Sequence, residues 1–290
     1  MELPLVVGVD GSEPSLRAVD WAADEAALRG LPLRLVHASL WERYEGTSLA
    51  KDLGKPSEQV MAEDIVETAA RRAHSRQADV QVTTDVLPEE PGYVLVRESR
   101  TASAMVLGSR GRSGMAEALL GSVSVTVAGH AHCPVIVLRG SHDNRAVPGR
   151  HGHVVVGVGE KQADAAAMRF AAEEARRRGV PLEAVRAWRC PAHETTDHPL
   201  LAGEPARLHE ERAAEVLQAA LRGIPDGVEV HRRTVEGHAR QVLLEASAGA
   251  DLLVVGARRR EGHYGLQLGR VAHGVLHHAA CPVTVVPQQA

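Results

Sequence analysis

Three glycines and two arginines separate an apolar run from a stretch that can open a helix in the segment LGSRGRSGMAEALLGSVS, residues 107–124. Glycine costs backbone entropy in a folded chain, so this clustering indicates that something needs the backbone at close range. A loop of backbone N–H groups that leads into a helix N-terminus is a ready site for an anion. The segment therefore predicts a phosphate site, and a tight structural turn is the alternative.

A second group of residues ends the first apolar run of the chain, in Gly8-Val9-Asp10-Gly11-Ser12. In an open parallel sheet, ligands bind beyond the carboxyl ends of the strands, where the strand order reverses. If the first and fourth strands are neighbours, Asp10 and the glycine loop face one crevice. Asp10 could instead open a turn and cap the next helix.

Charged and hydroxyl side chains in the glycine loop add to the predicted phosphate site. Arg110 and Arg112 would contribute positive charge, and the hydroxyls of Ser122 and Ser124 could donate hydrogen bonds to phosphate oxygens. Ser122 could also be only an N-cap. The loop is neither a Walker loop, which needs a lysine where this chain has leucine, nor a G-x-G-x-x-G dinucleotide turn.

The chain contains two copies of one sequence pattern. VGVDGSEPSLRAVDWAADEAALRGLPLRLVHA from Val7 aligns without a gap with VGVGEKQADAAAMRFAAEEARRRGVPLEAVRA from Val156, a shift of 149 residues. Near the ends of the halves, ASAMVLGSR matches ADLLVVGAR and GHAHCPVIVL matches HHAACPVTVV at a shift of 148 residues. This is a tandem duplication, and we expect a first domain over residues 1–140, a polar linker over 141–152 and a second domain over 153–290.

Each half alternates short apolar runs with helical stretches. Strands that alternate with helices and are apolar on both faces predict a parallel sheet covered on two sides, with five strands per domain. In the first half we expect strands near 5–9, 33–38, 80–87, 102–108 and 133–138, and helices near 13–29, 57–78, 91–100 and 122–130.

Composition excludes several classes of protein. A net charge of -4 and 2% aromatic residues argue against a nucleic-acid binder, which would show a basic surplus or aromatic stacking platforms. No stretch approaches the roughly 20 apolar residues that span a membrane, and the first residues lack a basic signal region. The three cysteines have no C-x-x-C spacing, so we expect reduced thiols and a cytoplasmic protein.

The spacing of the glycines resembles the G-x2-G-x9-G-[ST] nucleotide motif of the universal stress protein family. In this chain the motif is Gly108-x-x-Gly111, followed after nine residues by Gly121-Ser122. The opening VVGVDGSEPSLRAVDWA, the run LRLVHA and the closing CPVIVL are also similar to that family, and the resemblance covers both halves. It implies two tandem Rossmann-like α/β domains, each a five-stranded parallel sheet in the order 3-2-1-4-5 with helices on both faces.

The resemblance also implies ATP as the ligand, with Mg²⁺ or Mn²⁺ on its phosphates. The spacing of the histidines and cysteines predicts no metal site made of protein side chains. Gly8, Val9 and Asp10 would lie near the ribose and adenine, and Ala38 would line the adenine pocket. The residues that would hold the ribose and phosphates are Leu107, Gly108, Gly111, Gly121, Ser122, Val123 and Ser124, next to Arg110 and Arg112.

The second half departs from this motif. Gly256 and Gly269 remain in register, but Arg259 stands where Gly111 does, Arg270 replaces Ser122 and Gly159 replaces Asp10. Arginine in a loop that needs close backbone approach would fill the phosphate space. We therefore expect a degenerate second domain. The alternative is a cationic cluster that holds a different anion, or the phosphates in another pose, formed by Arg258, Arg259, Arg260 and Arg270.

The leading functional hypothesis is an ATP-binding stress-response or regulatory factor that acts through nucleotide-dependent conformation or partner binding. A nucleotide-independent interaction scaffold and an enzyme that slowly hydrolyses ATP or transfers nucleotidyl groups are the alternatives, and no catalytic residue is assigned. The last strand of a 3-2-1-4-5 sheet is an edge, and edges invite pairing. The resemblance implies pairing through that strand, which would join the two halves in an internal pseudo-dimer. Separately, we expect a homodimer of chains.

Overall fold

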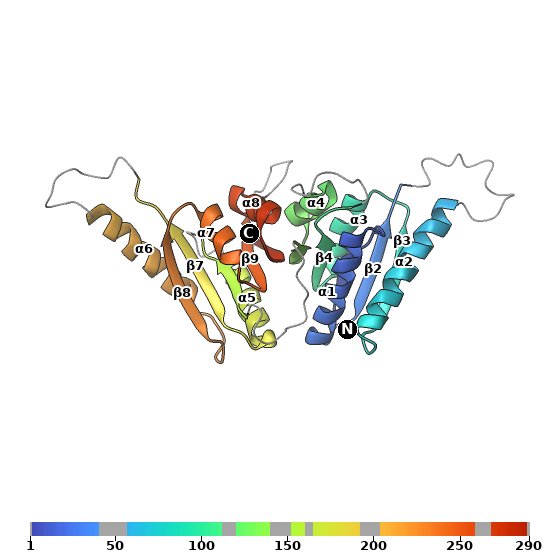
Figure 1. Ribbon diagram of the computed structural model, residues 1–290, viewed down its shortest axis with the longest axis horizontal. Helices are drawn as coiled ribbons and strands as arrows, with labels where there is room; N and C mark the ends of the chain where they lie inside the picture. Colours follow the sequence, from blue (N-terminus) through green and yellow to red (C-terminus); the bar gives the residue numbers. More distant parts are fainter. Residues whose placement is uncertain are drawn as a thin grey trace. The chain divides into compact units, whose positions relative to one another are not determined.

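The computed structural model describes residues 2–40, 57–111, 120–139, 152–159, 165–191, 204–258 and 268–288. Contacts divide the chain into two compact units, the first containing β1 to β5 and the second β6 to β10 (Figure 1). Each unit is built on parallel strands flanked by helices. The positions of Arg112, Arg259 and Arg260, and of residues 141–151 of the expected linker, lie outside the described residues.

The strands of the first unit follow the order β3-β2-β1-β4-β5, so the predicted order 3-2-1-4-5 is confirmed. Leu5 lies opposite Leu33 on one side and Ala104 on the other, which makes β1 and β4 neighbours. The strands are β1 (Leu5–Gly8), β2 (Leu33–Ala38), β3 (Val82–Leu87), β4 (Ala104–Gly108) and β5 (Val135–Leu138). The helices are α1 (Glu13–Arg29), α2 (Ser57–Arg76), α3 (Pro91–Glu98), the 3-10 turn η3 (Ser99–Thr101) and α4 (Ser122–His130).

The second unit repeats this arrangement in the order β8-β7-β6-β9-β10. Val154 lies opposite Leu182 and Leu252, as the alignment of the two halves predicts. Its strands are β6 (Val154–Gly157), β7 (Leu182–Trp188), β8 (Val230–Glu236), β9 (Leu252–Arg258) and β10 (Val283–Gln288). Its helices are α5 (Ala165–Arg178), α6 (Glu204–Ala220), α7 (Ala239–Ser247) and α8 (Arg270–His278).

The local sequence explains where helix α1 begins and ends. The side chain of Ser12 caps its N-terminus, and Gly30 ends it in the left-handed conformation at φ 67°. Its alanines at helical spacing, including Ala18 and Ala22, are fully buried, so the helix lies close to the sheet. Sequence predicted its bounds, 13–29, without error.

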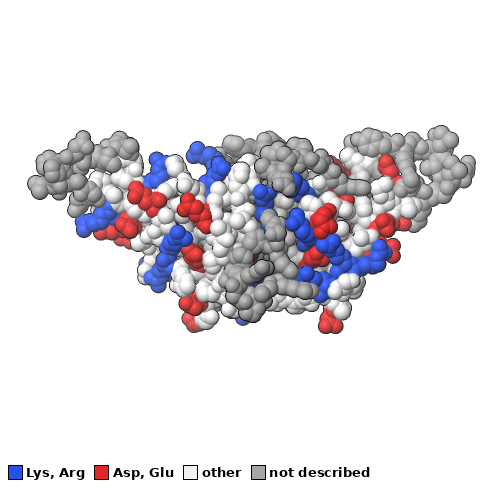
Figure 2. Space-filling view, in the orientation of Figure 1, with Lys and Arg blue, Asp and Glu red and all other residues white. Residues whose placement is uncertain are grey.

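Helix α2 packs on α1 and is joined to it by ion pairs. Arg72 binds Asp20 and Arg76 binds Asp24, each with a shortest N···O distance of 2.6 Å. Acidic and basic side chains are interspersed on the face of each unit seen in Figure 2, as expected for solvated helix faces. No helix in the described residues combines the length and apolar character needed to cross a bilayer.

Candidate functional site

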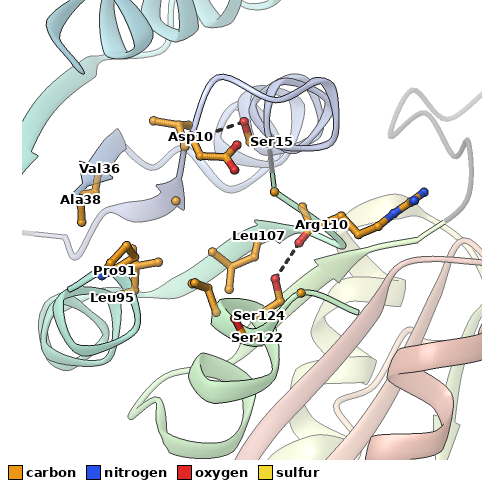
Figure 3. A pocket seen from close by; sticks show the side chains of 16 residues that line it. Asp10, Ser15, Val36, Ala38, Pro91, Leu95, Leu107, Arg110, Ser122 and Ser124 are labelled. Carbon is orange, nitrogen blue, oxygen red and sulfur yellow. Dashed lines mark hydrogen bonds between the residues drawn. The ribbon is translucent and has the colours of Figure 1, made fainter. Parts of the chain in front are cut away.

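A cavity of about 200 Å³ opens at the carboxyl ends of β1, β2 and β4 in the first unit (Figure 3). The structure brings to it every sequence-predicted site residue that it describes. These residues are Gly8, Val9, Asp10, Ala38, Leu107, Gly108, Arg110, Gly111, Gly121, Ser122, Val123 and Ser124. Segments separated by about a hundred residues therefore converge on one crevice, because parallel strands end at the same edge of the sheet.

The turn after β1 holds Asp10 at this edge. One carboxylate oxygen of Asp10, Oδ1, accepts hydrogen bonds from the Ser12 backbone N–H at 3.0 Å and from the Ser12 hydroxyl at 2.6 Å. The Asp10 N–H in turn lies 3.3 Å from the Ser15 hydroxyl. Asp10 therefore opens the turn, whereas Ser12 and not Asp10 caps α1.

Gly111 lies directly against the other carboxylate oxygen of Asp10. A Cβ atom placed on Gly111 would stand 2.5 Å from Asp10 Oδ2. The backbone of Gly111 is outside the left-handed region, so conformation alone does not require glycine there. The absence of a side chain at Gly111 is what lets Asp10 keep its place in the cavity.

Gly108 has a different, structural reason to be glycine. A Cβ atom there would lie 2.8 Å from the backbone carbon and oxygen of Pro14, at the start of α1. The Gly108 carbonyl accepts a 2.8 Å hydrogen bond from the Ser124 hydroxyl, and the Gly121 N–H donates to the Ser109 carbonyl at 2.9 Å. These contacts fix the ends of β4, α1 and α4 around the cavity.

Helix α4 begins at the cavity without a side-chain cap. Its N-cap residue is Gly121, and the first helical hydrogen bond is donated by the Val125 N–H to the Gly121 carbonyl. The N–H groups of the first helical turn have no partner within a helix. Unlike Gly108, Gly121 has φ −65° and room for a Cβ atom at ordinary contact distance, so neither conformation nor packing requires glycine there.

Two expected phosphate contacts have a different geometry in the structure. The hydroxyl proton of Ser124 is donated to the Gly108 carbonyl, because Ser124 is buried against the end of β4. Arg110 lines the cavity, but its guanidinium extends away from Asp10, Leu107 and Ser122 (Figure 3). The pKa of Arg139, which follows β5, is lowered mainly by burial and to a lesser extent by repulsion from the Arg110 cation. Arg110 therefore places its charge toward Arg139 and outside the cavity.

The apolar side of the cavity contains residues that sequence reasoning missed. Val36, Pro91 and Leu95 line it together with Leu107, and Ser15 lies opposite beside Asp10 (Figure 3). Side chains alternate between the two faces of a strand, so Val36 lies on the same face as Ala38. This alternation could have predicted Val36 from the sequence. Pro91 and Leu95 share a face of α3, but only the fold places that face over β2.

Comparison with known proteins identifies this architecture. The model of the Universal stress protein family matches the chain twice, over residues 3–139 and 151–287. The chain belongs to the universal stress protein family. A universal stress protein of Mycobacterium tuberculosis is 35% identical over 308 residues, which cover 99% of this chain and 96% of that protein.

Solved structures of the family match as well. The crystal structure of a universal stress protein from Archaeoglobus fulgidus aligns with 99% of this chain and 98% of its own, with a TM-score of 0.67 and 19% identity, and supports the fold. The universal stress protein from Archaeoglobus fulgidus in complex with dAMP aligns with 48% of this chain and 98% of its own, with 27% identity and a TM-score of 0.37.

The second copy of the universal stress protein pattern differs at two of the positions that line the first cavity. Gly159 occupies the position of Asp10, and Arg270 is the first residue of α8, where Ser122 begins α4. Gly269 is an N-cap without a side-chain hydrogen bond, as Gly121 is. Arg258 ends β9, and its side chain lies outside the described part of the chain.

The described cysteines and histidines of this universal stress protein form neither a disulfide nor a metal cluster. All three cysteines are free, and burial raises the pKa of both Cys133 and Cys281 to about 12. The described residues contain no group of three or more His, Cys, Asp or Glu side chains that could hold a metal ion. His130 ends α4 and lies 2.8 Å from the Thr126 carbonyl through its Nδ1.

Proposed function

We propose that the first unit of this universal stress protein binds ATP in the cavity at the ends of β1, β2 and β4. In this proposal, nucleotide binding regulates the conformation or the partners of the protein. One observation carries it: Asp10 and the N-terminus of α4, which no side chain caps, line the same cavity.

The base and ribose would occupy the enclosed part of the cavity. Val36, Ala38 and Leu95 offer an apolar wall for a purine, and the Asp10 carboxylate can accept hydrogen bonds from ribose hydroxyls. The enclosed volume of about 200 Å³ is below the roughly 300–1,000 Å³ of typical ligand pockets. The phosphates would therefore lie at its rim, over α4.

The rim is suited to phosphate through its backbone. The N–H groups of Ser122, Val123 and Ser124 precede the first helical hydrogen bond, and the helix dipole favours negative charge at this end. Gly121, for which packing gives no reason, would keep the approach to these groups open. Mg²⁺ or Mn²⁺ would enter on the ATP phosphates and neutralise part of their charge.

A regulatory role fits the side chains better than fast chemistry does. Among the described residues that line the cavity, Asp10 is the one carboxylate, and Ser12 donates two hydrogen bonds to one of its oxygens. These described residues therefore position no general base for rapid hydrolysis. A cytoplasmic location, where ATP is available and thiols stay reduced, and a homodimer with paired halves belong to the same proposal.

The proposal is tested by the stoichiometry of ATP, measured by equilibrium dialysis with Mg²⁺ after removal of copurified nucleotide. We expect one ATP per wild-type chain and its loss in Gly111→Arg, which copies the residue of the second half. Gly269→Ala is the matched control, because a Cβ atom there meets nothing within 4 Å. No binding to the wild type would favour a nucleotide-independent scaffold. Unchanged binding in Gly111→Arg would contradict the placement of the site. Two ATP per chain would mean that the second half binds nucleotide after all.

A further inference from the structure

The second unit contains a cavity that the universal stress protein motif does not describe. It encloses about 690 Å³, within the roughly 300–1,000 Å³ of small-molecule pockets. It lies between the end of β7, helix α6 and the start of α7. Its polar lining is basic: Arg186, Arg189, His209, Arg212 and His238, with Trp188 beside them.

The turn between β8 and α7 shapes one wall of this cavity. Gly237 adopts φ +154°, in the region that favours glycine, and a Cβ atom there would lie 3.0 Å from Val242. The Gly237 N–H donates to the Trp188 carbonyl at 2.8 Å, which ties the turn to the end of β7. The following residue, His238, is the N-cap of α7 and makes no side-chain capping bond.

The corresponding turn of the first unit is acidic. Glu89 and Glu90 stand at the positions of Gly237 and His238. The Glu90 carboxylate accepts hydrogen bonds from the N–H groups of Gly92 and Tyr93, at 2.9 and 2.6 Å, and so caps α3. The second unit has lost both carboxylates at a position where the first unit uses one of them to satisfy the helix N-terminus.

The end of the second strand has also become basic. His37 of the first unit lies 2.7 Å from the Val9 carbonyl, and Arg186 at the matching position donates to the Val158 carbonyl at 3.1 Å. Three positions later, Arg189 replaces Leu40. The end of the second strand is therefore more basic in the second unit than in the first.

The described residues that line this cavity carry positive charge. They include no Asp or Glu. Arg189 Nη1 lies 3.0 and 2.9 Å from the two ring nitrogens of His238, so these two basic groups face each other. Arg212 makes no ion pair or hydrogen bond through its side chain within the described residues. Such a lining favours an anion.

We propose that this cavity binds a small molecule that carries a phosphate group. Arg186, Arg189 and Arg212 line the cavity from three places, β7, the segment after β7 and α6. A tetrahedral phosphate presents acceptor oxygens in several directions, whereas a single carboxylate presents two in one plane. The volume that remains beside Trp188 and Val216 accommodates an organic part.

The test is isothermal titration calorimetry of the full chain with pyrophosphate and, separately, with citrate. It is done in a Gly111→Arg background, which removes the site proposed for the first unit. We expect saturable pyrophosphate binding, weakened by roughly tenfold or more in Arg189→Gln/Arg212→Gln, because hydrogen bonds from charged donors are lost. Arg222→Gln, which removes a charge at a residue that does not line the cavity, should bind as its parent does.

Three results would overturn this proposal. They are no binding of pyrophosphate, equal affinity in the parent and Arg189→Gln/Arg212→Gln, and an equal loss in Arg222→Gln. Citrate that binds as tightly as pyrophosphate would overturn the assignment to phosphate. Because the assignment rests on Arg189 and Arg212, it stands or falls independently of ATP binding by the first unit.

Discussion

The contact between Gly111 and Asp10 predicts that a single methyl group will weaken ATP binding. In Gly111→Ala, the new Cβ atom would lie 2.5 Å from Asp10 Oδ2, closer than real Cβ contacts, so the carboxylate must move. The backbone at Gly111 suits an L-residue, and Gly111 itself is exposed. The fold should therefore tolerate the change, with a melting temperature close to that of the wild type.

The expected loss follows from the role proposed for Asp10. A hydrogen bond to a charged group contributes about 1.5–3 kcal/mol. Losing one such bond between Asp10 and a ribose hydroxyl corresponds to a roughly 10- to 150-fold increase in the Kd for ATP. Gly223→Ala, where a Cβ atom meets nothing within 4 Å, is the matched control and should leave the Kd unchanged.

A double-mutant cycle measured by titration calorimetry separates this explanation from a direct clash with the nucleotide. If Gly111→Ala acts by displacing Asp10, it should add little to the loss already caused by Asp10→Ala. The double variant should then match Asp10→Ala to within about twofold, the usual error of additivity (~0.3–0.5 kcal/mol). A full second loss in the double variant would refute the reasoning and place Gly111 against the ligand itself.

Further predictions concern two glycines at the same cavity and the cysteines of the chain. Gly121→Ala should weaken ATP binding while the free energy of unfolding in urea changes by no more than about 1 kcal/mol, because its φ and packing accept a methyl group; undiminished ATP binding would remove Gly121 from the phosphate site. Gly108→Ala should instead cost about 1–3 kcal/mol of stability in the same assay, because its Cβ atom would meet the Pro14 backbone at 2.8 Å. In the native protein, an alkylating reagent at pH 8 should modify the half-buried Cys190 and leave Cys133 unmodified, because burial raises the pKa of Cys133 to about 12. This folded-state pKa exceeds the ordinary value of 9.0, so the Cys133 thiol should stabilise the native state below pH 9. That contribution should be lost as the pH rises toward 12, and the melting temperature should then fall.

Much of this fold follows from local patterns in the sequence. Apolar periodicity, the Ser12 cap and Gly30 define α1, and Gly121-Ser122 defines the start of α4, so the bounds of both helices were predicted. Strand limits were less exact: β3 begins at Val82 and not near residue 80, and β5 begins at Val135. Strand ends depend on hydrogen bonds to neighbouring strands, which local sequence does not specify.

The members of the site were largely predictable, but their orientations were not. The glycine spacing placed Gly108, Gly111 and Gly121 at the cavity, because a motif records which positions must lack side chains. It did not predict that Ser124 donates to the Gly108 carbonyl or that Arg110 extends away from the cavity. Both depend on how separate strands and helices pack.

The sequence by itself determined the duplication, the alternation of strands and helices, the family motif and its loss in the second half. All of these are properties of residue order and spacing. Only the tertiary structure decided that Pro91 and Leu95 complete the first cavity, and that Arg186, Arg189 and Arg212 converge in the second unit. These residues lie on segments that are distant along the chain, and the packing of helices against a parallel sheet brings them together.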